Sequence, residues 1–596
     1  MSGAQANFSA EGDPRLSNAG IENPLVRPQD RPIHDHTVSF EEYFYYAAKT
    51  RAEEDSLPDI PTRGIKDIIF PPKSGPGAIS VPESAEKSDG SPGAADEKSA
   101  KRRFSRGSTV AISDEEWMNA SRAMRTATWA AAFYLITTDI LGPFNAPFAI
   151  GTLGWGPGVS LYTVFGFLAG YSGYLLWQMF LGLDSYQYPL RTYGDLAFRL
   201  YGRFARHSFN FLQSVQLLCN VGIIVISNGQ ALSQVSKFRL CYAVCCLIWA
   251  ICGFFLGQVR TLQKYGWLAN VAIWMNLLII FISMGVIANS APNYNIAAYG
   301  SAGAVTVPDD ITPVNGVYPP VKHYGDLPNP GNFDGAIVGL MQGVYAYGGA
   351  MLFTEFMSEM RRPRDFIKGM WAAQFFIWSV YMIYGLCIYW WQGQYAYSIS
   401  YQGVSIYGWQ TVGNMLAVFS GLIAAGLYGN IGIKVLYNNV LVDFFNAPPL
   451  TVKSGKIAWA IIVPIYWTIA FIFAAAIPDF SGLTSMVAAC CIMQFTYTFP
   501  PLLSIGYNMK KYALAEGEGF DPATGRVTRH KTGISRWVKA FFSGPWYMNV
   551  FNVIYMLGSL ATAGLGAYSA CMNLIDAFES GQANAFTCAS PVNYSS

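Results

Sequence analysis

The sequence predicts an all-α integral membrane protein with eleven transmembrane helices, arranged as a five-plus-five inverted repeat with broken helices 1 and 6 plus one extra helix. Of its 596 residues, 52% are hydrophobic and 13% are charged, against about 25% charged in soluble domains. Eleven apolar stretches each approach the ~20 residues that cross a bilayer. The first and the sixth are interrupted at corresponding positions. Since five is an odd number, the second set of five would be inverted relative to the first.

Residues 1–120 are expected to form a largely disordered cytoplasmic tail, because a chain rich in Pro, Gly, Ser and charge buries too little apolar surface to offset ordering entropy. It lacks the apolar core of a signal peptide, so the first span should act as its own insertion signal. Capping-box patterns at Ser39–Glu42 and Ser113–Glu116 predict two short helices. These helices either pack on the cytoplasmic face or act as a gate or regulatory latch. The basic run Lys101–Ser108 is either a patch for anionic lipid or a phosphoserine switch.

A transmembrane domain is expected over residues 121–575, followed by a short extracytoplasmic tail over 576–596. The eleven apolar spans are 128–151, 158–182, 208–234, 240–257, 266–288, 333–358, 371–393, 412–435, 457–477, 482–508 and 546–572. A polar loop from 289 to 332 separates the first five spans from the next five.

The distribution of Lys and Arg predicts a cytoplasmic N-terminus and an extracytoplasmic C-terminus. With this orientation the inner loops carry nineteen of these residues and the outer loops three, Lys237, Arg239 and Lys322. The glycosylation sequon at Asn593 would then face the glycosylating side, whereas those at Asn7 and Asn119 would be cytoplasmic and unused. The plasma membrane is favoured over the vacuolar membrane, although both place the tail in the cytosol.

Cysteine usage and charge exclude several classes of protein. Nine of the ten cysteines lie in apolar spans, where cysteine is usually a small buried hydrophobe, and the adjacent pairs Cys245–Cys246 and Cys490–Cys491 lack zinc-type spacing. Cys571 and Cys588 both fall near the predicted outer face, so a disulfide between them is open. A net charge of +2 gives no reason to expect nucleic-acid binding. No metal or cofactor is expected.

Span 1 contains the most informative run of residues. Between Asp139 and Pro147 it reads DILGPFNAP. Proline removes an N–H and clashes with the preceding turn, so the helix should break near Pro143. Polar backbone bared in this way is tolerated at membrane depth only inside protein or beside a water-filled cavity. An acid at this depth, Asp139, is by default a functional residue.

Span 6 carries the matching interruption, Gly348–Gly349. Each glycine weakens a helix by about 1 kcal/mol relative to alanine, although the pair could instead serve close helix packing. Interrupted helices at corresponding positions of two halves are the best sequence pointer to a transporter's binding site.

The predicted chemistry of the two breaks suits a zwitterion. Unpaired N–H groups and the positive dipole end after the span 1 break suit a carboxylate, while the unwound carbonyls of span 6 suit an ammonium group. An α-amino acid carries both. Polar residues near the middle of spans 3 and 8 either contact the substrate or join helices. The candidate substrate-binding residues are Gly142, Pro143, Phe144, Asn145, Ala146, Asn220, Tyr345, Tyr347, Gly348, Gly349 and Asn430.

The run from Asp139 to Ala149 resembles the first helix of the amino acid/auxin permease family. The end of span 6, Phe353–Phe366, and the tail island Ser39–Tyr43 are similar to the family's fungal neutral amino acid members. The resemblance covers about residues 120–575. It implies an eleven-helix transporter with an inverted repeat that moves amino acids with protons. Ile140 stands where the wider family usually has a glycine, and Asp139 where many members carry Asn, so the coupling ion does not carry over directly.

Proton coupling needs a group that changes charge, and the predicted spans contain no histidine. Asp139, nearest the break, is expected to carry or sense the proton. The alternative is a structural acid that bonds Thr137 or Thr138. Lys434, at the inner end of span 8, is expected to extend its ammonium group to the interface.

Glu355 is the other acid well inside a span. It precedes Arg361 and Arg362 by less than two helical turns. We therefore expect these three residues to form an inner gate closed by a salt bridge.

The leading function is secondary active transport of neutral L-amino acids by alternating access, with the proton as coupling ion and membrane lipid as surroundings. The alternative is a non-transporting amino acid sensor or a channel-like protein on the same fold. The chain contains no phosphate-cradling P-loop motif, which disfavours an ATP-driven pump. The predicted spans hold no cluster of His, Asp and Glu, which disfavours an enzyme.

Overall fold

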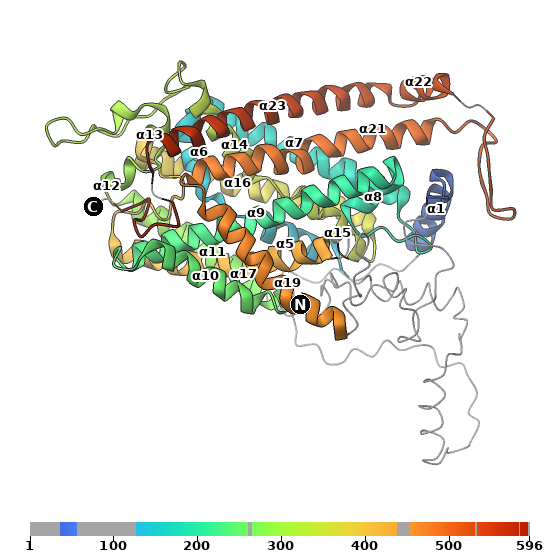
Figure 1. Ribbon diagram of the computed structural model, residues 1–596. Helices are drawn as coiled ribbons and strands as arrows, with labels where there is room; N and C mark the ends of the chain where they lie inside the picture. The colour runs from blue at the N-terminus through green and yellow to red at the C-terminus, as the bar shows by residue number, and fades with distance from the viewer. Residues whose placement is uncertain are drawn as a thin grey trace, which may run out of the picture.

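Long apolar helices make up most of the described chain in the computed structural model, which covers residues 36–56, 125, 127–259, 265–437, 441, 453–530, 533–582 and 584–593 (Figure 1). Within these residues, nine helical stretches are long and apolar enough to cross a membrane. The protein is therefore mostly helical, as predicted. The sequons at Asn7 and Asn119, the basic run Lys101–Ser108 and the second tail island Ser113–Glu116 lie outside the described residues.

Seven of the nine stretches are uninterrupted helices, and two are composites. The seven are α7 (Trp155–Leu183), α9 (Arg203–Val235), α11 (Tyr265–Ala288), α16 (Phe366–Gln392), α17 (Tyr407–Leu436), α19 (Lys453–Ala475) and α23 (Trp546–Glu579). The composites are α14 (Phe333–Ala346) with η5 (Ala350–Leu352) and α15 (Phe353–Glu359), and α20 (Phe480–Val487) with η9 (Ala488–Ile492), η10 (Gln494–Thr498) and α21 (Phe499–Tyr512).

Two further apolar segments fall outside this set because they are short or broken. The first is α10 (Tyr242–Leu256). The second is the span 1 region, which consists of α5 (Trp129–Ile140), η2 (Pro143–Asn145) and α6 (Ala146–Leu153). The count of eleven crossings and the inverted repeat remain predictions.

The broken helices lie at the centre of the bundle. In the most apolar part of the stretch formed by α14 and α15, 78% is buried inside the protein. For α23 the buried share is 28%, so α23 faces the surroundings. Helix α16 packs on α5, α6 and α7, and α14 packs on α6, α20 and α23. Helix α9 lies against α10, α17, α19 and the short helix α8 (Tyr193–Tyr201).

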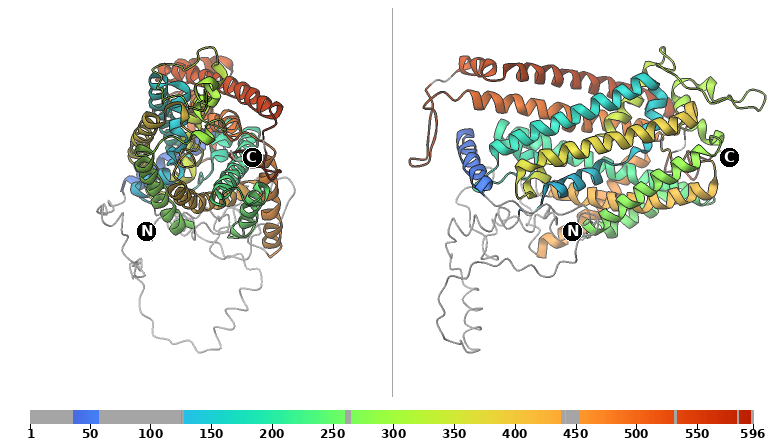
Figure 2. Two further views of the ribbon diagram at one scale, coloured as in Figure 1. Left: turned by 90° about the vertical axis from the view of Figure 1, so that its left-hand side faces the viewer. Right: turned by 180° about the vertical axis from the view of Figure 1, so that it is seen from behind.

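Short elements cover the two ends of the bundle. At one end lie α12 (Tyr294–Ala297), α13 (Ala302–Thr306), η4 (Pro308–Asp310), η7 (Gly393–Tyr395) and the last described residues of the chain. At the other lie α1 (Phe40–Ser56), α8 (Tyr193–Tyr201), α22 (Ile534–Phe542) and the antiparallel hairpin of β1 (Gly519–Asp521) and β2 (Arg526–Thr528). The tail helix α1 and the C-terminal segment are thus at opposite ends (Figure 2). The 3-10 turn η6 (Pro363–Asp365) leads into α16.

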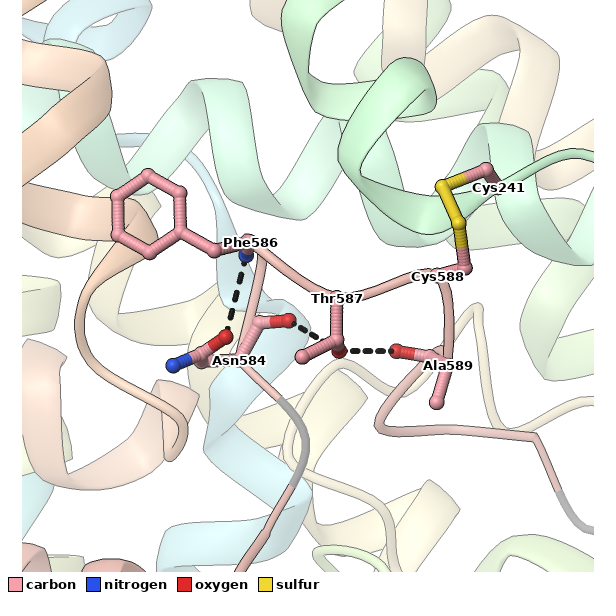
Figure 3. Close-up of a disulfide and its surroundings, with 6 residues drawn as sticks. All are labelled: Cys241, Asn584, Phe586, Thr587, Cys588 and Ala589. Carbon is pink, nitrogen blue, oxygen red and sulfur yellow. Dashed lines mark hydrogen bonds between the residues drawn. A yellow bond between two sulfur atoms is a disulfide. The ribbon is translucent and has the colours of Figure 1, made fainter.

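A disulfide joins Cys241 to Cys588 (Figure 3), so Cys588 does not pair with Cys571, the pairing that the sequence left open. Cys571 is a free, exposed thiol on α23. The segment after α23 folds back over the start of α10, where the N–H groups of Tyr242 and Ala243 donate to the carbonyls of Cys588 and Thr587 at 3.2 and 3.1 Å. The path of the backbone after α23 therefore selects Cys241 as the partner of Cys588.

The first tail island forms the helix α1, and it is fixed to the bundle by buried charge. The hydroxyl of Ser39 accepts from the N–H of Glu42 at 3.1 Å, as the capping pattern predicted. Arg51 pairs with Asp184, the residue after α7, at 2.8 Å. Arg125, just before α5, also pairs with Asp184, through two nitrogens at 2.8 and 2.9 Å. The side chains of Arg51, Arg125 and Asp184 are all buried.

The pKa of Asp184 shows that the buried cluster of Arg51, Arg125 and Asp184 favours the charged carboxylate. Burial alone would raise the pKa of Asp184, but the guanidinium groups of Arg125 and Arg51 outweigh it and lower the pKa to about 2. A lowered pKa stabilises the folded form above the ordinary value of 3.8, and this stabilisation is lost only as the pH falls toward 2. Docking of α1 through Asp184 should therefore persist across the physiological range.

We expect Asp184→Asn to release α1, because the buried guanidinium groups of Arg51 and Arg125 would keep only Glu54 as a counter-charge, and breaking a buried ion pair costs about 3–5 kcal/mol. A cysteine introduced at Ala47, which is buried on α1, reports the release through maleimide labelling. Labelling should be slow in Ala47→Cys alone and fast when Asp184→Asn is added.

The matched control for this experiment is Asp55→Asn, also combined with Ala47→Cys. It breaks the exposed pair of Asp55 with Arg364, and exposed pairs contribute at most about 1 kcal/mol. If the introduced cysteine is labelled equally slowly in all three backgrounds, the buried cluster does not hold α1.

Candidate functional site at two broken helices

Proline chemistry explains the break in span 1. Helix α5 ends at Ile140, and the next two residues are extended, with φ −69° and ψ 98° at Leu141 and φ −159° and ψ 72° at Gly142. The residue before a proline avoids helical angles because of the proline ring, so Pro143 fixes Gly142 in this form. The chain resumes at η2 with Pro143 in its first turn, where a missing N–H costs nothing.

The break in span 6 contacts that in span 1. Helix α14 ends at Ala346, and the chain passes through Tyr347, Gly348 and Gly349 before η5 begins. A Cβ at Gly349 would lie 2.5 Å from Cγ1 of Ile140 and 3.0 Å from Oδ2 of Asp139. A side chain at Gly349 would therefore push the two breaks apart, and glycine permits the approach.

Open space adjoins the span 1 break. Gly142 is exposed, and a Cβ built there would meet none of the non-neighbouring described atoms within 4 Å. An exposed glycine between buried Leu141 and Pro143 gives a ligand direct access to the backbone.

A tyrosine from a third helix joins the two breaks. The hydroxyl of Tyr381, on α16, accepts from the N–H of Gly142 at 3.3 Å. It lies 2.9 Å from the carbonyl oxygen of Ile140 and 3.2 Å from that of Ala346. One phenol thus contacts polar backbone groups on both sides of the gap between the half-helices.

Asp139 lies where spans 1, 6 and 8 meet. Its Oδ1 accepts from the hydroxyl of Tyr428, on α17, at 3.1 Å. The expected alternative, a bond to Thr137 or Thr138, is not formed. Both threonines instead donate to the carbonyls four residues earlier, at 2.8 and 2.7 Å, because a hydroxyl in a helix reaches its own backbone most easily.

Gln342, on α14 of span 6, connects η2 of span 1 with α20 of span 10. Its Oε1 accepts from Nδ2 of Asn145 at 2.9 Å. Its Nε2 lies 2.7 Å from the hydroxyl of Thr484 and 3.1 Å from that of Ser485. Asn145 therefore uses its amide to bond span 6, while Ala146 beside it is fully buried.

Aromatic rings surround the span 1 break. Phe144 meets Tyr401 and Tyr384 edge to face, with ring centroids 5.0 and 6.1 Å apart. Tyr347 is fully buried, and its hydroxyl donates to the carbonyl of Tyr162 at 3.0 Å, so it packs against α7. Tyr345 is only partly buried and packs against the buried clusters on either side of the break.

The two asparagines have different surroundings. Nδ2 of Asn430 donates to the carbonyl of Val259, just beyond α10, at 2.6 Å, so Asn430 joins two helices. Asn220 is buried on α9, and its Oδ1 has no partner among the described residues. Oδ1 of Asn430 also lacks a partner there, so each asparagine keeps an acceptor available to a ligand. Any contact of either residue with substrate remains a prediction.

Glu355 faces α9. Its Oε1 accepts from Nε2 of Gln213 at 3.4 Å, and its Oε2 has no partner in the described part of the chain. Within those residues, no ion pair joins Glu355 to Arg361 or Arg362. The salt bridge of the expected inner gate is thus not formed in this structure.

Three residues of the site were not identified from the sequence: Gln342, Tyr381 and Tyr428. A tyrosine at bilayer depth needs a partner for its hydroxyl, which makes every mid-span tyrosine a candidate. The α16 helix contains Tyr381, Tyr384 and Tyr389, and the pattern alone does not show which one reaches the breaks.

Comparison with known proteins identifies relatives of the chain. Residues 125–516 match the family model described as "Transmembrane amino acid transporter protein". A Fusarium pseudograminearum protein named "Transmembrane transporter" is 24% identical over 476 residues, covering 78% of this chain and 87% of its own. The Neurospora crassa "N amino acid transport system protein" is 23% identical, covering 76% and 86%. The Arabidopsis thaliana "Lysine histidine transporter-like 1" is 20% identical, covering 67% and 85%.

We expect Gln342→Leu to destabilise the protein, because it removes the acceptor of the partly buried Asn145 amide and the donor to the hydroxyls of Thr484 and Ser485, at about 1–3 kcal/mol per buried group left unsatisfied. The measurement is the melting temperature of the purified protein in detergent.

Gln374→Leu provides a control of identical chemistry. Gln342 and Gln374 are similarly buried, 1% and 4% exposed, but the amide of Gln374 has no hydrogen-bond partner in the described structure. Its replacement should be neutral or stabilising. An equal fall in melting temperature for both variants would contradict the role given to Gln342.

Proposed function

We propose that this chain, which belongs to the transmembrane amino acid transporter family, moves neutral L-amino acids across its membrane by proton-coupled secondary transport. Family membership supports a multi-pass membrane protein of amino acid transport. The observation that carries the finer proposal is the contact between the two helix breaks, with Gly349 against Asp139 and open space beside Gly142.

The chemistry of the breaks supports a zwitterionic substrate. The backbone near Gly142 and the start of α6 offers N–H groups to a carboxylate, and the carbonyl end of α14 offers acceptors to an ammonium group. The rings of Phe144, Tyr384 and Tyr401 carry no charge to balance a charged substrate side chain. This favours an uncharged R group.

The position of Asp139 supports its role as proton carrier or sensor. It lies at the junction of spans 1, 6 and 8, where its carboxylate contacts Tyr428 and adjoins Gly349. A change of charge at this junction would act on both broken helices at once. Glu355 is the second candidate.

The proposed transport cycle is alternating access through a five-plus-five inverted repeat of eleven helices. The inner half-helices α5 and α15 would move, with Glu355, Arg361 and Arg362 as the inner gate that pairs in another state of the cycle. The opposite placement of α1 and the C-terminal segment is consistent with a cytoplasmic N-terminus. The plasma membrane is the proposed location.

Uptake into cells or proteoliposomes tests this function. We expect saturable accumulation of neutral amino acids against their gradient, increased by an inward proton gradient and abolished by a protonophore. The labelled panel should include lysine and histidine, because one relative is named for them. Binding without accumulation would favour the alternative, a non-transporting sensor, and flux without saturation would favour a channel.

Asp139→Asn separates the two candidate acids. The amide keeps the shape and the acceptor for Tyr428 but cannot exchange a proton at physiological pH. We expect its uptake to lose the dependence on external pH, while Glu355→Gln retains it. Unchanged pH dependence in Asp139→Asn would exclude Asp139 as the coupling group, and loss in Glu355→Gln alone would transfer the role to Glu355.

A further inference from the structure

We infer that Tyr381 is a positioning residue whose single hydroxyl hydrogen is shared between the two broken helices, leaving one backbone carbonyl free for the substrate's ammonium group. This inference rests on the proposed function, since it assigns a role to Tyr381 within the same site. It concerns a residue that belongs to neither broken helix.

The ring of Tyr381 is fixed by its neighbours. The residue is 2% exposed. Tyr162 stacks on the ring with centroids 5.7 Å apart, and Tyr347 lies at 5.6 Å. Tyr162 and Tyr347 also contact each other, with centroids 6.0 Å apart, so the three rings form one cluster that limits the movement of the Tyr381 hydroxyl away from the gap. The position of the oxygen is therefore set by α7 and α14 packing around α16.

The hydroxyl meets backbone groups that lack their usual helical partners. In an unbroken helix the carbonyl of residue i accepts from the N–H of residue i+4. The breaks end this pattern at Ile140 and at Ala346, and both carbonyls lie near the Tyr381 oxygen. The N–H of Gly142, which would otherwise extend α5, donates to the same oxygen. Without Tyr381, the N–H of Gly142 and the carbonyl that holds the hydroxyl hydrogen would lose a partner.

The hydroxyl of Tyr381 can bond only one of the two carbonyls at a time. A phenol has one hydrogen to donate, and two carbonyls compete for it. The shorter distance favours Ile140, at 2.9 Å, over Ala346, at 3.2 Å. The carbonyl of Ala346 then has an open lone pair at the end of α14. An ammonium group has three hydrogens and no acceptor, so it suits this position.

This sharing links substrate binding to helix geometry. When an ammonium group donates to the carbonyl of Ala346, the hydroxyl of Tyr381 donates to the carbonyl of Ile140. This hydrogen bond holds α5 against α16. When the site empties, the two carbonyls compete again. The spacing of spans 1 and 6 thus depends on occupancy through one hydroxyl group.

Tyr381→Phe tests the inference, because it keeps the ring and removes only the hydroxyl. We expect the KM for amino acid uptake to rise at least tenfold and the ligand-induced increase in melting temperature to disappear. The control is Tyr389→Phe on the same helix, whose hydroxyl accepts from the N–H of Tyr324 at 3.0 Å, away from the breaks. Its KM should stay within twofold of the wild type.

A second variant covers the case in which Tyr381→Phe does not fold. Tyr162→Leu removes the ring stacked on Tyr381, and the hydroxyl of Tyr162 has no partner in the described residues. It should also raise KM. Wild-type KM in both Tyr381→Phe and Tyr162→Leu, or in whichever of them folds, overturns the inference. If the wild type itself accumulates no amino acid, the proposed function fails instead.

Discussion

The site depends on one constraint: backbone groups opened inside a membrane must find partners within the protein. Here the broken helices do not supply these partners themselves. The hydroxyl of Tyr381 meets the backbone at Gly142, Ile140 and Ala346 from α16. Gly349 lets the two breaks touch, and Gln342 ties η2 of span 1 to spans 6 and 10. Each break is thus stable because of helices that are unbroken or belong to the other half.

Helix α5, which precedes the break in span 1, is held at both of its ends. Arg125, just before α5, pairs with Asp184 in a buried cluster shared with α1. Tyr381 bonds the backbone at the far end of α5. A short helix held by charge at one end and by a hydroxyl at the other can swing only if one of these contacts is released. The tail helix is for this reason part of the machinery around the site, since its Arg51 completes the cluster.

The sequence was sufficient where local chemistry decides the structure. Pro143 and the glycines placed the breaks, and the capping pattern placed α1, because proline and serine act on their own backbone. It was insufficient where the outcome depends on which distant groups meet. Cys588 pairs with Cys241 because of the path of the segment after α23. Tyr347 was expected at the site, yet its hydroxyl bonds α7, while Tyr381, from a helix with no predicted site residue, reaches the breaks. Rotation of a helix about its axis decides such cases, and span 7 is aromatic on several faces.

The two acids within the broken spans, Asp139 and Glu355, differ in a way that bears on the proposed coupling. A coupling group must sense both the substrate and the movement of the half-helices. Asp139 satisfies this by contact, since it lies against Gly349 of span 6 and accepts from Tyr428 of span 8. Glu355 contacts Gln213 on α9, and one of its oxygens is without a partner in the described residues. A buried carboxylate oxygen without a donor is costly if charged, so the proposed movement of α15 would be favoured if it brought Glu355 a partner. The contacts of Asp139 suit the proposed coupling of substrate binding to helix movement. The contacts of Glu355 suit a group that finds a hydrogen-bond partner in only one of the proposed states.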